Sequence, residues 1–417
     1  MFNVSREFAP PFSLIAPYFW LGALFYLAGT FGLLFLHADA THFDLGVVAW
    51  AHLFLLGFVM MIIFGAMAQL VPVVLEVGHF SVDFYYLIWP LLGLGTLGMV
   101  LGFTVAPGLL PYGGMLVLVS MLIFLADTIL TLRKVERFSL TVKTVAATNA
   151  FLLLGILVGF VMALGIGAGV SVAIDKWLSA HIVLVLGGYV TLTIVGMSMI
   201  LLPMFGLSHG FDETPVQRAF WLMNASVLLF LVGTVAELPW LHTLALLGMV
   251  VAMAFYLWQI VIINKTRARK EWDIWYKSMV VGYGSLAAAL ALGVVGFLAE
   301  SERLMLAAAW FLVFGFFTYL IVGHLYKIIP FLVWFERYSP LVGKKKVPML
   351  ADMVPLKMAD YQFAFTTLGL VTAGVGLLAQ SDTLFKAGAT FLATGAIFLF
   401  TSVRYMMAFG KEEINEQ

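Results

Sequence analysis

Hydrophobic side chains run along this chain in long, nearly unbroken blocks that short polar stretches separate. Apolar runs of about 20 residues can cross a bilayer core of roughly 30 Å as helices. None of the blocks shows the alternation of a membrane strand, and lipid offers the backbone no hydrogen-bond partners, so an all-α membrane bundle is predicted. The twelve predicted spans, numbered in chain order, are Phe12–Leu36, Leu45–Val74, Phe84–Val105, Tyr112–Leu132, Val145–Val170, Trp177–Pro203, Phe220–Val235, Leu241–Ile263, Met279–Leu298, Leu304–Phe335, Tyr361–Ala379 and Leu384–Val403.

Spans two, six and ten each contain a histidine and a proline. The prolines Pro72, Pro203 and Pro330 are separated by 131 and then 127 residues. This spacing indicates an internal repeat of one integral membrane domain, residues 1–417. We expect three pseudo-repeated four-helix arcs, at about 11–135, 143–270 and 275–409.

Composition sets limits on the chemistry. The chain is 63% hydrophobic and 11% charged, with a formal net charge of +0 and no cysteine. The missing thiols exclude covalent c-type haem, iron–sulfur clusters and thiolate metal sites. The first span is too long for a cleaved signal peptide, so we expect it to be retained.

Basic residues fall mostly in alternate loops, which predicts an inner (cytoplasmic) membrane protein with both termini cytoplasmic. The same distribution makes these loops a topology signal rather than a nucleic-acid surface, so the expected surroundings are the lipid bilayer and no nucleic acid. The basic residues on the expected cytoplasmic face are Arg133, Lys134, Arg137, Lys143, the run 265–270, Lys344, Lys345, Lys346 and Lys411.

The most informative polar residues are His52 and His181. They lie 20 and 22 residues before the prolines of their spans, so their depths are similar. A histidine in a bilayer is costly unless it is paired, hydrated or bound to a metal. Each is therefore a candidate haem or metal ligand, and a planar cofactor between their helices is one hypothesis. The alternatives are an interfacial histidine and a proton-pathway residue.

His324 lies only six residues before Pro330, about 14 residues or roughly 21 Å deeper than the other two histidines. It cannot share one iron with His52. Lys327 follows one turn later on the same face. This pair is compatible with a proton entry route, a quinol or anion contact, a second metal or a structural pair. Gln69 is a further candidate for a polar pathway.

Other histidines lie near the predicted span ends. His37, His42 and His242 are expected at the outer ends, and the first loop, with Asp39 and Asp44, is a candidate weak copper or zinc site. We expect two more histidines, at positions 79 and 209, to be solvated in cytoplasmic loops. The absence of a carboxylate at mid-membrane depth argues against a proton antiporter.

The topology and several motifs resemble a known superfamily. Twelve helices in three arcs, with His52 on helix two and His181 on helix six, resemble subunit I of the haem–copper oxidases. Closer similarity is to the divergent NnrS branch of membrane haem proteins, and further positions carry this likeness. They are Pro11, Phe12, Leu14, Gly57, Phe58, Gly65, Pro72, Met197, Gly206, Leu207, Ser208 and His209.

The resemblance implies haem b, or alternatively copper, held by His52 and His181, with a role in electron transfer or in a nitric-oxide or respiratory stress response. A respiratory or cytochrome partner is implied as well. Departures from the family pattern limit this expectation. Oxidases have paired histidines on helix ten, whereas the depth-matched residues here are Trp310 and Phe311, and Phe220–Val235 lacks the copper histidines of helix seven. We therefore do not expect an autonomous dioxygen reductase.

Two alternatives come from different functional classes. Internal repeats and helices interrupted by glycine and proline are also typical of carriers, so the first alternative is a transporter or channel for a small solute. An accessory subunit of a respiratory complex is the other.

Overall fold

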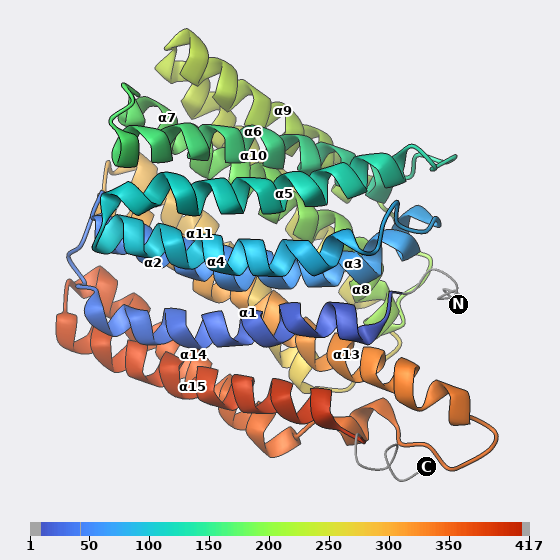
Figure 1. Cartoon of the computed structure of the whole chain (residues 1–417). Coiled ribbons are helices and arrows are strands. Elements are labelled where there is room, and N and C mark those ends of the chain that lie inside the picture. Colours follow the sequence, from blue (N-terminus) through green and yellow to red (C-terminus); the bar gives the residue numbers. More distant parts are fainter. Residues whose placement is uncertain (1–9, 42, 411–417) are drawn as a thin grey trace. The chain divides into compact units, whose positions relative to one another are not determined.

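The computed structural model describes residues 10–41 and 43–410, in which the regular elements are helices (Figure 1). Among these residues there is no strand, apart from one isolated bridge between Ser208 and Arg267. The α-helices are α1 (Phe12–Gly32), α2 (Leu45–Phe54), α3 (Met61–Leu75), α4 (Phe84–Thr104), α5 (Leu110–Leu132), α6 (Leu140–Ala168), α7 (Ile174–Ile182), α8 (Leu192–Gly206), α9 (Thr214–Ala236), α10 (Pro239–Lys265), α11 (Ile274–Leu298), α12 (Glu302–Trp310), α13 (Thr318–Arg337), α14 (Leu356–Ala379) and α15 (Asp382–Ala408).

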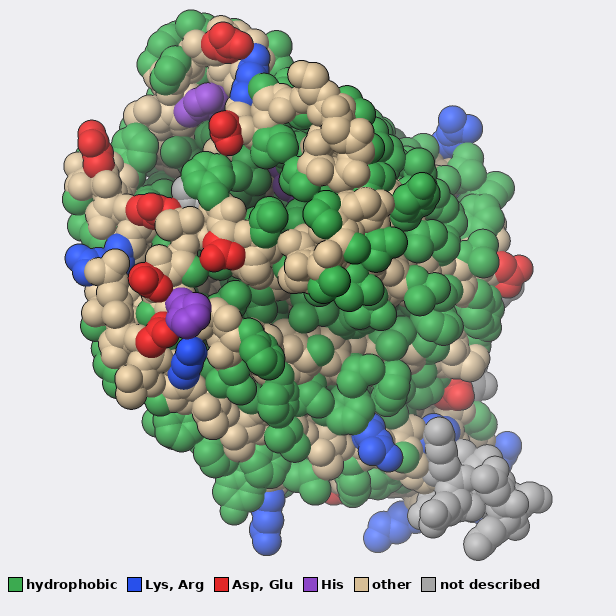
Figure 2. Space-filling model, turned by 60° about the vertical axis from the view of Figure 1, so that its left-hand side comes forward, with side chains coloured by type: hydrophobic (Ala, Val, Ile, Leu, Met, Phe, Trp, Pro, Cys, Tyr) green, Lys and Arg blue, Asp and Glu red, His purple; other side chains and the backbone are tan. Residues whose placement is uncertain are grey.

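Twelve helical segments of the described chain are long and apolar enough to cross a membrane, and they follow the order of the predicted spans. Their outward surfaces are apolar. On α4, for example, Leu94, Leu97 and Leu101 form an exposed stripe at helical spacing. Figure 2 shows hydrophobic side chains over most of the visible flank and charged side chains mainly at its margins. Such surfaces require lipid contact, and the chain is a polytopic integral membrane protein.

Spans two, six and ten share a feature that the sequence did not predict. Each changes from α- to π-helical geometry in its first half, over Leu55–Met60, Val183–Thr191 and Phe311–Phe317. The wider π turn shifts the hydrogen-bond ladder by one residue. In span ten the Thr318 N–H accordingly donates to the carbonyl of Val313, five residues earlier, and the Thr318 hydroxyl donates to the same carbonyl at 2.9 Å. Segments of this kind often mark functional sites.

The described chain divides into two compact units. Unit 1 contains residues 68–270, and unit 2 contains residues 10–67 and 271–410. The division falls inside α3, between Met67 and Ala68. Three four-helix arcs remain a prediction, and each unit is described below with its own contacts.

In unit 1, the helices of consecutive spans pack as antiparallel hairpins, α4 with α5 and α9 with α10. Glycine permits the closest approach between α4 and α5. A Cβ atom on Gly113 would lie 2.5 Å from the Met99 nitrogen and 2.7 Å from the Gly98 carbonyl carbon. Both neighbours are backbone atoms, so the contact depends on the missing side chain.

In unit 2, α14 pairs with α15, and α1 lies beside α15 (Figure 1). The end of α13 connects these helices. The Phe12 N–H donates to the Glu336 carboxylate at 2.8 Å, and the Arg337 guanidinium donates to the carbonyls of Met407 and Phe409. The start of α1 and the end of α15 therefore lie at the same end of unit 2. The cytoplasmic orientation of that end stays a prediction.

The segment between α13 and α14 is ordered. It forms two short 3-10 turns, Ser339–Leu341 and Leu350–Met353. The Trp334 indole N–H donates to the Pro348 carbonyl at 2.9 Å, which fastens the segment to α13.

Candidate functional site

His52 lies in the last turn of α2, directly before the π-helical segment Leu55–Met60. Its Nδ1 lies 2.8 Å from the carbonyl oxygen of Val48, one turn earlier. A carbonyl only accepts hydrogen bonds, so Nδ1 carries the proton and Nε2 carries the lone pair. Metal-ligating histidines commonly hold their second nitrogen on a carbonyl in this way. The local geometry thus fits a ligand that uses Nε2.

His181 occupies the matching place in span six, in the last turn of α7 and before Val183–Thr191. Its Nδ1 donates to the carbonyl of Gly155 on α6 at 2.9 Å. The ring lies in a recess on α6, because a Cβ atom on Gly159 would be 2.6 Å from the ring carbon Cε1. His181 therefore also has its proton on Nδ1 and its lone pair on Nε2.

Each of these histidines belongs to a different compact unit, His181 to unit 1 and His52 to unit 2. Within its own span each histidine lies two or three residues before a π-helical segment, and the common depth of the two side chains stays a prediction. The planar cofactor expected between their helices remains a hypothesis.

In span ten the residue directly before the π-helical segment is Trp310. Its indole N–H donates to the Leu370 carbonyl at 2.9 Å, and its ring lies 4.3 Å from that of Phe314. Phe314 also contacts the rings of Trp50 and Phe54 from span two, at 5.6 and 4.7 Å. Packed aromatic rings fill this contact between spans two and ten, so the residues there do not fit a haem.

His52 points away from that aromatic contact. Successive helix residues turn by about 100°, so a residue midway between Trp50 and Phe54 lies on the opposite face of α2. A cofactor on His52 would therefore lie on the side of span two that faces away from span ten.

His324 and Lys327 are close in unit 2, but Lys327 has another partner. Its ammonium lies 2.6 Å from a carboxylate oxygen of Asp273, whose other oxygen caps α11 by accepting the Tyr276 N–H. His324 is buried, with Nδ1 donating to the Leu320 carbonyl at 2.7 Å. The charge of Lys327 is thus balanced by Asp273, a pairing that the sequence did not predict. Because the lysine already has an anionic partner, the hypothesis that it contacts an anionic ligand has less support.

The prediction of a solvated loop position for His79 is wrong. The side chains of His79 and Asp127 are fully buried, and Nδ1 lies 2.8 Å from an Asp127 carboxylate oxygen. Nε2 lies 2.7 Å from the Ala68 carbonyl. That carbonyl lacks its normal helical partner because residue 72, four positions later, is a proline without an N–H. His79 supplies the missing donor.

One face of α5 holds the loop that carries His79. Asp127 accepts the Ser81 N–H, Thr131 accepts the Phe80 N–H, and Lys134 donates to the His79 carbonyl. Asp127 and Thr131 are one helical turn apart on one face of α5, and Lys134 follows two residues after the helix ends. Asp127 lies near the end of its span rather than at mid-depth. An ionisable residue within a span, together with the proline-freed carbonyl, was the signal for this pair in the sequence.

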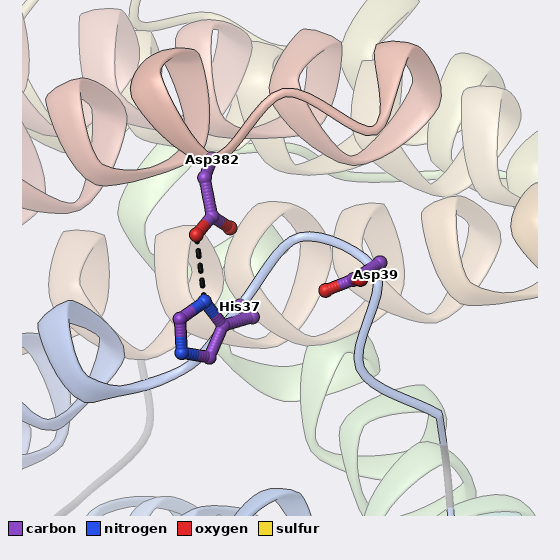
Figure 3. A group of neighbouring side chains, drawn as sticks. All are labelled: His37, Asp39 and Asp382. Carbon is purple, nitrogen blue, oxygen red and sulfur yellow. Dashed lines mark hydrogen bonds and ion pairs between the residues drawn. The ribbon is translucent and has the colours of Figure 1, made fainter.

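The first loop contacts the start of α15 through His37 (Figure 3). His37 Nδ1 lies 2.6 Å from an Asp382 oxygen, and the other Asp382 oxygen accepts the Ala38 N–H at 2.7 Å. Ligand atoms of His37, Asp39 and Asp382 all lie within 4.8 Å of one another. N–H donors already occupy both oxygens of Asp382, so these contacts attach the first loop to the start of α15. The copper or zinc site of this loop stays a prediction.

The other histidines and acids near the span ends have separate surroundings where they are described. Asp44 caps α2 by accepting the Gly46 N–H, and position 42 lies outside the described residues. His242 bonds the Thr234 hydroxyl at 3.1 Å within the α9–α10 hairpin. His209 is exposed, as predicted.

Gln69, the predicted pathway residue, is buried on α3. Its side-chain oxygen has no hydrogen-bond partner among the described residues, and the same holds for the Thr193 hydroxyl of α8. Both residues lie in unit 1. Unsatisfied buried polar atoms are costly and call for water, an ion or a ligand.

Compared with protein-family models and with curated protein sequences, the chain matches none.

Proposed function

We propose that the protein is a cofactor-binding membrane protein similar to haem–copper oxidase subunit I and NnrS, in which His52 and His181 are metal ligands. The cofactor is haem b or, alternatively, copper, and the setting is the cytoplasmic membrane with both termini inside. His324 is kept as a separate candidate for a second metal or a proton route.

One observation carries this proposal. His52 and His181 each donate Nδ1–H to a backbone carbonyl and lie two or three residues before a π-helical segment. The hydrogen bond orients the ring and leaves Nε2 as the basic nitrogen, as in known metal-ligating histidines. His324 makes the same kind of hydrogen bond to the Leu320 carbonyl, so the position just before a π-helical segment is what sets His52 and His181 apart.

The protein side of the chemistry follows from these contacts. The carbonyls of Val48 and Gly155 hold the two imidazoles in one tautomer and raise their basicity as ligands. A bound iron or copper ion would supply one-electron transfer or bind a diatomic gas such as nitric oxide. The apolar side chains of the spans limit the access of water.

Optical spectra and metal analysis of the purified protein test the proposal. We expect wild type to show a Soret band and bound iron, or bound copper without that band. Both His52→Ala and His181→Ala are expected to lose most of the bound cofactor, because each removes one ligand. The control is His209→Ala, which removes an exposed histidine. A wild-type protein with neither iron nor copper, or full occupancy in both variants, would reject the assignment.

Transport of a small solute is the second candidate, and the unsatisfied Gln69 oxygen and Thr193 hydroxyl favour it. Buried polar atoms of this kind suit a polar path through the apolar interior of unit 1. Flux into proteoliposomes depleted of haem, measured with a panel of small anions and neutral solutes, tests this candidate. It requires flux that Gln69→Leu removes; loss of flux in His324→Ala would instead indicate a path in unit 2. Copurification of a respiratory or cytochrome partner with a cofactor-free chain would instead indicate an accessory subunit.

A further inference from the structure

A groove of about 520 Å³ lies on the outer surface of the α9–α10 hairpin in unit 1, separate from the histidines described above. It begins at the first residue of α9 and extends about two helical turns along that span. The lining residues are Thr214, Gln217, Arg218, Trp221, Leu222 and Phe255.

The groove combines a cation with an apolar floor. The Arg218 guanidinium lies 5.7 Å above the centre of the Phe255 ring, and Trp221 is 62% exposed beside it. Arg218 is one turn inside a membrane span, at the level where arginine and tryptophan side chains meet lipid headgroups. Toward the middle of the span the groove is lined by Trp221 and Leu222, and those side chains suit an acyl chain.

Further basic residues lie at this end of the unit. Gly206 and Leu207 accept the N–H groups of Arg269 and Ala268, so the loop after α10 lies at the same end of the unit. That loop adds the exposed Lys265 and Lys270.

Two acids, Asp212 and Glu213, directly precede the groove in the sequence, and Asp212 is already engaged at the start of α9. The hydroxyl and N–H of Thr214 donate to Asp212 and hold the pKa of its carboxyl below the usual range. Arg218 makes a smaller contribution in the same direction. Because the Asp212 carboxylate is hydrogen-bonded to Thr214 at the start of α9, the Arg218 guanidinium can still bind another anion.

We propose that this groove binds one anionic phospholipid, with the phosphate at Arg218 and an acyl chain along Trp221 and Leu222. The proposal does not depend on the cofactor assigned to His52 and His181.

Native mass spectrometry of the full chain, released from nanodiscs of equal parts phosphatidylcholine and phosphatidylglycerol, tests the proposal. Wild type is expected to retain one phosphatidylglycerol in preference to phosphatidylcholine. Arg218→Gln should lower that retention about tenfold, because it removes a charge-assisted contact to phosphate. Arg218→Lys keeps the charge and should retain most of the lipid.

Arg404→Gln is the matched control, since Arg404 is an exposed arginine near the end of another span, α15. Its lipid retention should equal that of wild type. Equal retention of both lipids by wild type, or equal losses in the Arg218→Gln and Arg404→Gln variants, would overturn the proposal. A dimer mass that disappears only in Arg218→Gln would also overturn it and assign the groove to a second copy of the chain.

Discussion

Replacing Asp127 with alanine is expected to lower the free energy of unfolding by about 3–5 kcal/mol, the usual effect of removing one partner from a buried ion pair. Both side chains of the His79–Asp127 pair are fully buried. One proton lies on Nε2 toward Ala68, and a second lies between Nδ1 and the carboxylate, so the pair is neutral overall. Alanine would leave Nδ1 and the Ser81 N–H without a partner. Reversible unfolding in mixed micelles measures the change.

Asp127→Asn is the control for this prediction. Its amide oxygen can accept the Ser81 N–H, and its NH₂ can donate to Nδ1 of a neutral His79 that still donates from Nε2. We expect a loss of only about 1 kcal/mol, as for an ordinary hydrogen bond. Equal losses in the asparagine and alanine variants would contradict this account of the protons.

Pro72 allows a second check on the same pair. In His79→Ala the Ala68 carbonyl loses its donor, because Pro72 has no N–H to offer. Adding Pro72→Ala restores a helical N–H at that position, so the double variant should be more stable than His79→Ala alone. If Pro72→Ala instead lowers the stability of His79→Ala further, His79 does not replace the N–H donor that is missing at Pro72.

Replacing Gly113 with alanine is the second large expected effect, a loss of about 1–3 kcal/mol from overpacking. The added methyl group would meet two backbone atoms of α4 at 2.5 and 2.7 Å, and backbone cannot move aside as a side chain can. The α4–α5 hairpin would have to separate. The same unfolding measurement detects the change.

Gly284→Ala is the matched control in α11. A Cβ atom there has no neighbour within 4 Å, so the substitution keeps only the higher helix propensity of alanine. We expect it to stabilise the protein by about 0.5–1 kcal/mol. Similar changes at positions 113 and 284 would mean that helix propensity, rather than the close contact between helices, controls both sites.

The amino-acid sequence by itself determined the spans. A segment in lipid must be apolar over about 20 residues and must satisfy its backbone internally, so hydrophobic length alone predicts a helix and its place in the order. The same reasoning identified His52 and His181 as unusual, because their position inside apolar segments is visible without a structure. It also identified Trp310 as the residue at the corresponding level of span ten.

Only the tertiary structure decided which partners these side chains have. Lys327 pairs with Asp273, which is 54 residues away, and His79 pairs with Asp127, which is 48 residues away. Hydropathy along the chain is a local property, whereas such pairs depend on how distant helices pack. The π-helical segments were also visible only in the structure. A shift of one residue in the hydrogen-bond ladder leaves the pattern of apolar residues almost unchanged, so hydropathy does not reveal it.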